Sequence, residues 1–315
     1  MSYWQLLLLI LPVFALMALG MGLRRLQWLT AEADESLLRL VVNFLYPCII
    51  FENVHANPAL REAGNLAWAP LVGFATMTGG MAICYFAARL LGFTVGTGLR
   101  TFAFTAGIYN YSYITVPLMT SLFGAGSLGV LFAHNVGAEA AIWVVGVMLL
   151  TGRSWTQGWR QLVSPPVLAL VVSVAVNLSG LAPHVPMLVL NVVHPLAACA
   201  IPMGLILSGA TMAEHFFERP RELFELRTSL AAVALRLGLM TGLFLLLARF
   251  GPFSADLRHV VLVQAAMPAA FLPLVLVKHH GGHLLTAVRV VMATVVASIV
   301  LTPLWLRLGL AWVGP

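Results

Sequence analysis

The chain has 315 residues, of which 61% are hydrophobic and 9% are charged, and its formal net charge is +6. A water-soluble domain carries about 25% charged residues, so this composition excludes an ordinary soluble protein and indicates an integral membrane protein. Because the arginines flank apolar segments, the basic excess predicts membrane topology and not nucleic-acid binding. Cys48, Cys84 and Cys199 lie far apart inside apolar segments, which predicts packing residues and neither a disulfide nor a metal site.

Ten apolar segments follow one another along the chain, each near the roughly 20 residues that a membrane-spanning helix needs. The fold class is therefore predicted to be all-α. The polar link 151–161 would separate residues 1–150, a first set of five helices, from residues 162–315, a second set. The predicted spans are 4–23, 36–54, 67–91, 99–124, 126–150, 162–180, 187–212, 226–248, 257–278 and 284–310.

The cations of the loops and span ends are divided unequally between the two sides of this layout, with eleven on one side and four on the other. The positive-inside rule assigns the richer side to the cytoplasm, so both termini are predicted to be extracytoplasmic. In a bacterium this would be the inner membrane. The richer side holds Arg24, Arg25, Arg39, Arg89, Arg100, Arg153, Arg160, Arg219, Arg221, Arg227 and Lys278.

The two halves of the chain carry prolines at matching places. Pro117 and Pro273 are 156 residues apart, and Pro47 and Pro202 are 155 apart. Because each half holds five spans, an odd number, the second half starts on the opposite side of the membrane from the first. The matched prolines therefore predict an inverted five-helix repeat.

The fourth and ninth spans contain residues that interrupt a helix. The fourth carries Gly107, Asn110 and Ser112 before its proline, and the ninth carries Gln264 and Pro268. In lipid, a broken helix persists only where it is buried in protein or lines a cavity. A proline kink packed by neighbouring helices is the alternative interpretation, but paired breaks in two halves indicate a transporter's binding site.

Each break exposes the positive end of a half-helix, which suits an anion such as a carboxylate without a lysine in the bilayer. A mid-span proline also removes a hydrogen-bond donor and frees nearby carbonyls. Polar side chains at the breaks can satisfy those groups or bind substrate. The predicted substrate-binding residues are Asn43, Asn110, Tyr111, Ser112, Tyr113, Thr115, Pro117, Gln264, Met267, Pro268 and Pro273.

Three stretches resemble the auxin efflux carrier family, which includes plant auxin exporters and bacterial malate or malonate permeases. They are Leu40–Pro47, Asn110–Pro117 with the following Phe123-Gly124, and Met267-Pro268-Ala269. The resemblance covers nearly the whole chain and places Asn110, Pro117 and Pro268 at a crossover. One departure is Thr115, where bacterial members often have glycine. The longer cytoplasmic loop of plant exporters is absent.

The resemblance implies two inverted five-helix repeats whose broken helices 4 and 9 cross. It also implies a scaffold of spans 1, 2, 6 and 7, a transport domain of spans 3–5 and 8–10, and a homodimer formed through the scaffold. The substrates implied are organic monoanions or dicarboxylates. Besides the lipid bilayer, this anion and a second copy, no partner or cofactor is predicted.

Ionisable residues inside spans are functional candidates by default. Glu139 in span five is a candidate proton carrier, and His134, about one turn earlier, is a further candidate for proton coupling. Arg289 in span ten and Arg236 in span eight are candidate partners for it or for substrate, with structural hydrogen bonds or snorkelling as the alternatives. His279, His280 and His283 have no nearby acid and indicate a solvated loop more than a metal site.

The leading hypothesis is a secondary transporter for a small organic anion that works by alternating access, with proton coupling through Glu139 as a sub-hypothesis. A sodium-coupled transporter of the bile-acid symporter type is the first alternative, although the acidic residue expected for sodium is missing from both breaks. An intramembrane enzyme is the second, and the chain has no His-Glu-x-x-His, Gly-x-Ser-x-Gly or paired intramembrane carboxylates. A channel or receptor has no distinguishing sequence feature.

Overall fold

The computed structural model describes residues 1–152, 164–218 and 225–314. In these residues every regular element is helical, which confirms the prediction of an all-α fold. Seven helices of this described part are long and apolar enough to cross a membrane. They are Tyr3–Arg25, Ala31–Val54, Gly64–Leu90, Ala125–Thr151, Met187–Ala213, Leu226–Phe250 and Leu284–Val313.

The elements follow the predicted spans in chain order. In the first half they are α1 (Tyr3–Arg25), the continuous run α2, η1 and α3 (Ala31–Leu40, Val41–Leu45, Tyr46–Val54), α4 (Ala63–Leu90), α5 (Leu99–Gly107), α6 (Thr115–Phe123), and the run α7, η5 and α8 (Leu128–Ala141, Ile142–Gly146, Val147–Thr151). In the second half they are α9 (Pro165–Leu178), α10 (Met187–Glu218), the run α12, η9 and α13 (Leu226–Ala234, Leu235–Leu239, Met240–Phe250), α14 (Ala255–Ala265), α15 (Leu272–His279) and α16 (Leu284–Val313).

Three predicted spans are not single long helices. The fourth is divided into α5 and α6, the ninth is divided into α14 and α15, and the sixth is represented by the shorter α9. The first two residues predicted for that sixth span and residues 153–161 of the predicted linker lie outside the described residues. So do four cations used in the topology prediction: Arg153, Arg160, Arg219 and Arg221.

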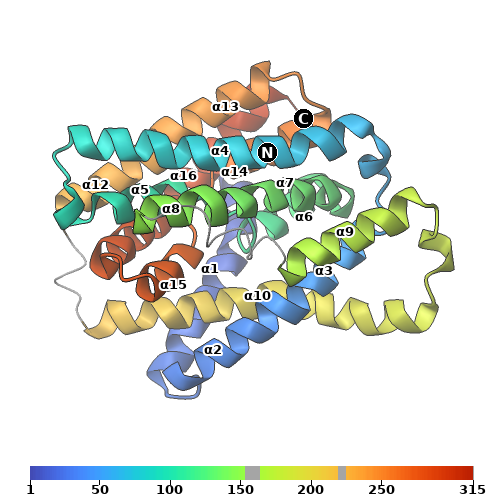
Figure 1. Ribbon diagram of the computed structural model, residues 1–315, viewed down its shortest axis with the longest axis horizontal. Coiled ribbons are helices and arrows are strands. Elements are labelled where there is room, and N and C mark those ends of the chain that lie inside the picture. Colours follow the sequence, from blue (N-terminus) through green and yellow to red (C-terminus); the bar gives the residue numbers. More distant parts are fainter. Residues whose placement is uncertain (153–163, 219–224, 315) are drawn as a thin grey trace.

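Described residues beside three of the loops predicted for the cytoplasmic side, 3–4, 7–8 and 9–10, lie at one end of the molecule (Figure 1). The backbone N–H of His283, between α15 and α16, donates to the hydroxyl of Thr101 at the start of α5, at 3.0 Å. The guanidinium of Arg227, at the start of α12, donates to the carbonyl of Leu91 after α4. At the left of Figure 1, α4 meets α5 and α12 begins. The grouping follows the predicted alternation of spans, and which side of the membrane this end faces stays a prediction.

The remaining loops meet at the opposite end. Asn57, after α3, donates through its side-chain amide to the carbonyl of Gly126 at 2.9 Å. Asn177, near the end of α9, donates to the carbonyl of Asn57 at 2.8 Å. Ser254, before α14, bonds to the side chain of Asn65 at the start of α4. The connection from α9 to α10 lies at this end, at the right of Figure 1.

Two helix pairs approach each other closely through glycines. A methyl group added to Gly20 of α1 would lie 2.0 Å from the carbonyl oxygen of Ile206 in α10. One added to Gly137 of α7 would lie 1.8 Å from the carbonyl oxygen of Pro70 in α4. Small residues at such positions let helix backbones pack directly in a membrane. In Figure 1, α10 runs along one side of the molecule with α2 and α3, and α4 runs along the other.

Candidate functional site

The two divided helices lose their regular structure near the middle of the bundle. α5 ends at Gly107 and α6 begins at Thr115, so residues 108–114 form the first break. α14 ends at Ala265 and α15 begins at Leu272, so residues 266–271 form the second break. The sequence therefore predicted both interruptions in the right segments.

The two breaks cross and bond to each other. The backbone N–H of Asn110 donates to the carbonyl of Pro268 at 2.8 Å, and the N–H of Ala270 donates to the carbonyl of Ile108 at 2.9 Å. These bonds form a single antiparallel bridge centred on Tyr109. Each break thus satisfies part of the backbone that the other has freed, as burial in an apolar interior requires.

The prolines stand at the start of the second half-helix in each case. Pro117 is the third residue of α6, and Pro273 is the second residue of α15. The first turn of a helix has no acceptor for its N–H groups, so proline is tolerated there while it disrupts the turn before it. Pro268 lies inside the second break and contributes its carbonyl to the crossing.

The first break is held mainly by neutral side chains of its own. The side-chain oxygen of Asn110 accepts from the N–H of Ile114 at 3.2 Å, which caps the start of α6. The hydroxyl of Thr115 donates to the carbonyl of Asn110 at 2.6 Å and lies 3.2 Å from the side-chain oxygen of Gln264. Asn110, Thr115 and Gln264 are all buried.

The carbonyl of Tyr111 collects donors from two other helices. It accepts from the side-chain amide of Asn135 in α7 at 2.9 Å and from that of Gln264 in α14 at 3.3 Å. Gln264, which was predicted for the site, therefore joins the ninth span to the first break. Asn135 was not among the predicted site residues, and its position one turn before Glu139 was the available signal.

Two tyrosines connect the first break to helices of the predicted scaffold. The hydroxyl of Tyr46 in α3 lies 2.5 Å from the hydroxyl of Ser112. The ring of Tyr113 packs on α10 at Gly204, where an added methyl group would lie 2.1 Å from the ring. Sequence reasoning did not select Tyr46, although it directly precedes Pro47.

Hydrogen-bond donors remain open at the start of α6. The side-chain nitrogen of Asn110, a residue only 2% exposed, has no partner in the described residues. No partner in the described part of the chain serves the backbone N–H groups of Tyr111, Ser112 and Tyr113 either. These groups lie at the positive end of the α6 dipole, so the first break offers a set of open donors on buried and half-buried residues.

The second break is held by a cation. The side chain of Arg236, in η9, is fully buried and donates to one carbonyl of the break and to the last two carbonyls of α14. Its Nε donates to Met267 at 3.0 Å, and its Nη2 donates to Gln264 at 3.3 Å and Ala265 at 3.2 Å. A cation at the C-terminal end of a helix such as α14 is favourable because that end carries partial negative charge.

Aromatic rings complete the environment of this arginine. Its guanidinium carbon lies 5.3 Å from the ring centre of Tyr109 and 5.2 Å from that of Phe244. None of the ion pairs in the described residues includes Arg236, and its Nη1 has no hydrogen-bond partner there. The positive charge is therefore balanced by carbonyl dipoles and ring faces, without a carboxylate.

Threonines from neighbouring helices satisfy the other groups of the second break. Thr241 of α13 donates to the carbonyl of Ala265 at 2.8 Å, and Thr302 of α16 donates to that of Ala266 at 2.7 Å. The hydroxyl of Thr294 accepts from the N–H of Ala269 at 3.2 Å. Sequence reasoning missed all three threonines.

Two of the ionisable candidates, His134 and Glu139, lie in α7, and a third, Arg289, lies in α16. His134 is buried near the crossing, with Nε2 3.4 Å from the hydroxyl of Tyr109. Glu139 is partly buried in α7, one turn after Asn135, whose side chain donates to the carbonyl of Tyr111 in the first break. Arg289 does not reach the crossing, because its guanidinium pairs with Glu225 at 2.8 Å at the end of the bundle.

Asn43 lies apart from the other predicted site residues. It is exposed in η1, and no hydrogen bond from its side chain to either break is found in the described residues. In contrast, the predicted residues Met267 and Pro273 are buried at the second break. The place of Asn43 in a substrate site thus stays a prediction without a contact to support it.

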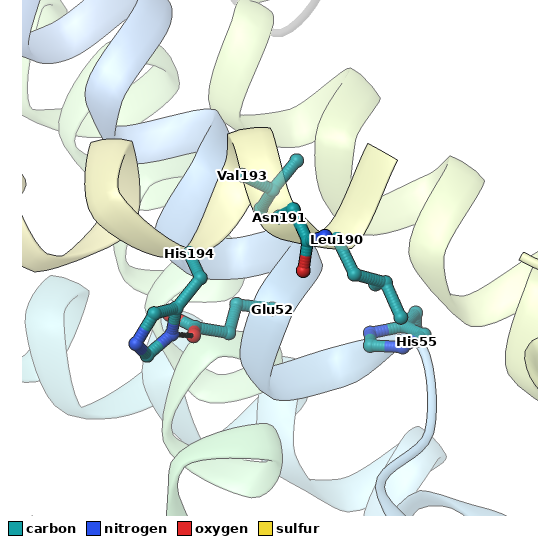
Figure 2. Close-up of a pocket in the computed structure, with 6 residues that line it drawn as sticks. All are labelled: Glu52, His55, Leu190, Asn191, Val193 and His194. Carbon is teal, nitrogen blue, oxygen red and sulfur yellow. Dashed lines mark hydrogen bonds and ion pairs between the residues drawn. The ribbon is translucent and has the colours of Figure 1, made fainter. Parts of the chain in front are cut away.

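A separate cavity of about 530 Å³ lies between α3 and α10, away from the crossing. Figure 2 shows Glu52 and His194 facing each other as an ion pair, with His55 at the other side of Asn191. The carboxylate of Glu52 in the wall of this cavity is already bonded to His194. We assign the candidate site to the crossing, where open donors are gathered.

Crossed, interrupted helices that meet inside a bundle of apolar helices are the arrangement of secondary membrane transporters. The chain belongs to the family described as membrane transport protein, the auxin efflux carrier family, which matches residues 6–306. It is 26% identical over 305 residues to an uncharacterized transporter of Methanothermobacter thermautotrophicus, covering 94% of this chain and 96% of the relative. The resemblance seen in the sequence motifs is thus confirmed.

Proposed function

We propose that this membrane transporter carries a small organic anion, a mono- or dicarboxylate, by alternating access at the crossing of the fourth and ninth spans. The observation that carries the proposal is the set of open donors at the start of α6. The side-chain nitrogen of buried Asn110 and the backbone N–H groups of residues 111–113, where Ser112 is buried and Tyr111 and Tyr113 are half-buried, have no partner in the described residues.

Buried donors without acceptors are costly unless a ligand supplies the acceptors. A carboxylate has two oxygens and about four lone-pair positions, so it matches a cluster of N–H groups. The partial positive charge at the start of α6 favours an anion further, and charge-assisted hydrogen bonds are the stronger kind. A neutral ligand gains less from this site, which supports an anionic substrate.

The alternating-access mechanism rests on the family's architecture. We propose ten spans in two inverted five-helix repeats, with α1, α2–α3, α9 and α10 as the scaffold and the other helices as the transport domain. Movement of that domain would change the contacts of Tyr46 with Ser112 and of Tyr113 with Gly204. A homodimer through the scaffold, with both termini extracytoplasmic, completes the proposal.

The test begins with a thermal-shift screen of small carboxylates on the purified protein, followed by uptake of the stabilising compound into proteoliposomes. We expect the variant Asn110→Ala to lose binding by about tenfold or more, since it removes a donor to a charged group worth about 1.5–3 kcal/mol. Asn43→Ala is the matched control and should bind normally. Equal binding by the wild type and Asn110→Ala, with both folded, would contradict the proposal.

Proton coupling through Glu139 extends the proposal. Glu139 lies one turn after Asn135, which contacts the first break, so an ionised Glu139 would repel an anion bound there and anion binding favours the protonated carboxyl. We expect wild-type uptake of the anion to increase when the anion is supplied on the acidic side of a pH gradient. Glu139→Gln should transport without that dependence, while Glu35→Gln, at an exposed acid paired with Arg39, should keep it. An unchanged response in Glu139→Gln would remove this role.

A further inference from the structure

Carbonyls of the last two residues of α14 and of the adjoining second break converge on one point. Gln264, Ala265 and Met267 all direct their carbonyl oxygens to the side chain of Arg236. Unwound backbone carbonyls and the C-terminal ends of half-helices are also the ligands that sodium uses in transporters with broken helices. The second break thus has the backbone arrangement of a cation site, and a side chain of the protein fills it.

The position of Arg236 in its own helix allows this contact. It lies in the π-helical turn η9, and the hydroxyl of Thr241 is 3.2 Å from its carbonyl. A π-helical turn changes the direction in which the following side chains point, and such turns are frequent at functional sites. Because Thr241 also donates to Ala265, at 2.8 Å, this segment contacts the break through a second residue.

The charge of Arg236 is permanent and cannot leave the site. The guanidinium is fully buried, and the described residues offer it carbonyls and the rings of Tyr109 and Phe244 but no ion-pairing carboxylate. A guanidinium stays protonated under all ordinary conditions. A metal cation held by the same carbonyls would instead exchange with the solution.

We propose that Arg236 is a positioning residue that takes the place of a coupling cation at the second break. It holds the carbonyl end of α14 against the crossing, so the donors of the first break keep their arrangement without a bound metal ion. The inference rests on the proposed function in that the crossing is the transport site. Its consequence is that neither the stability of the crossing nor transport depends on sodium.

The experiment measures thermal unfolding of the purified wild type, Arg236→Lys, Arg236→Gln and Arg236→Ala in sodium, choline or dilute guanidinium salts of equal ionic strength. The wild type should unfold at the same temperature in sodium and choline. Arg236→Gln should unfold at a clearly lower temperature, and Arg236→Lys should recover much of the loss because it restores the charge. Guanidinium, but not choline, should partly restore Arg236→Ala.

The matched control is Arg289→Gln, which removes an arginine that pairs with Glu225 away from the crossing. Its unfolding temperature should stay near that of the wild type. Stabilisation of the wild type by sodium would overturn the inference, and so would equal stability of Arg236→Gln and Arg236→Lys. If the variants do not fold, the unfolding temperatures of the wild type in sodium and in choline still test whether sodium stabilises the crossing.

Uptake in proteoliposomes is the second readout. Wild-type uptake should be equal with sodium or choline outside, and Arg236→Lys should retain more activity than Arg236→Gln. Uptake that requires sodium would overturn the inference. Unfolding needs no substrate, so a wild type that binds no carboxylate but shows the expected unfolding pattern would remove the proposed function and leave the role of Arg236 standing.

Discussion

The two breaks have similar backbone geometry but opposite chemistry. The first, at residues 108–114, carries its own polar side chains and leaves donors open at the start of α6. The second, at residues 266–271, has no polar side chain of its own and receives Arg236 and threonines from neighbouring helices. Two similar interruptions in one chain are therefore satisfied by different kinds of groups.

Each break exposes the carbonyl end of one half-helix and the N–H end of the next, and the two breaks differ in which of these ends a side chain from another helix serves. The start of α6 presents N–H groups, which a protein can leave for an anion to satisfy. The end of α14 presents carbonyls, which need a donor or a cation, and Arg236 supplies both. We infer that the first break recognises substrate while the second break fixes the crossing.

The largest effect is expected where the first break meets α10. Gly204→Ala places a methyl group 2.1 Å from the ring of Tyr113, so the ring must move. Transport should fall by about tenfold or more, which is 1.4 kcal/mol or more in the transport barrier. Gly22→Ala, where no atom lies within 4 Å of the new methyl group, is the control for a helical glycine. Normal uptake by Gly204→Ala would show that the contact between Tyr113 and α10 does not limit the rate of transport.

A matched pair of threonines gives a smaller effect and separates the two breaks. Thr115→Val removes the donor to the carbonyl of Asn110, and Thr302→Val removes the donor to that of Ala266. Each should lower the free energy of unfolding by about 1–3 kcal/mol, because a buried carbonyl loses its partner. Only Thr115→Val should also raise the KM for uptake. An equal rise in KM for both variants would contradict the division of tasks.

The smallest effect is expected at Arg289. Its side chain is 18% exposed and that of its partner Glu225 is 41% exposed, so water screens this pair more than it screens the fully buried Arg236. Arg289→Gln should therefore lower the unfolding temperature and uptake less than Arg236→Gln does. A large loss of uptake would mean that charge outside the crossing takes part in transport, and the contrast between the breaks would be incomplete.

The sequence predicted the elements whose signals are local. Apolar length predicted the spans, and the glycines and prolines predicted which helices are divided. Pro117 also illustrates the limit of such reasoning. The interruption lies before it, at residues 108–114, because the ring of proline disrupts the preceding turn and fits the first turn of α6.

The polar partners of the second break depend on contacts between helices that are distant in the sequence. Thr294 bonds to the carbonyl of Val290 in its own helix as well as to Ala269. Because a threonine in an apolar span can bond within its own helix, its presence in the sequence does not indicate a contact with a distant break. Arg236 was recognised as an intramembrane cation, but its direction depends on the π-helical turn η9. No periodicity in the sequence indicates that turn.

The most direct test of the account is an experimental structure of the protein with a bound dicarboxylate, with malonate as the first probe. The account predicts ligand density within hydrogen-bond distance of the side-chain nitrogen of Asn110 and the N–H groups of residues 111–113. It also predicts that Arg236 keeps its bonds to the carbonyls of Gln264, Ala265 and Met267. Density on Nη1 of Arg236, with Asn110 left without a ligand, would contradict the account.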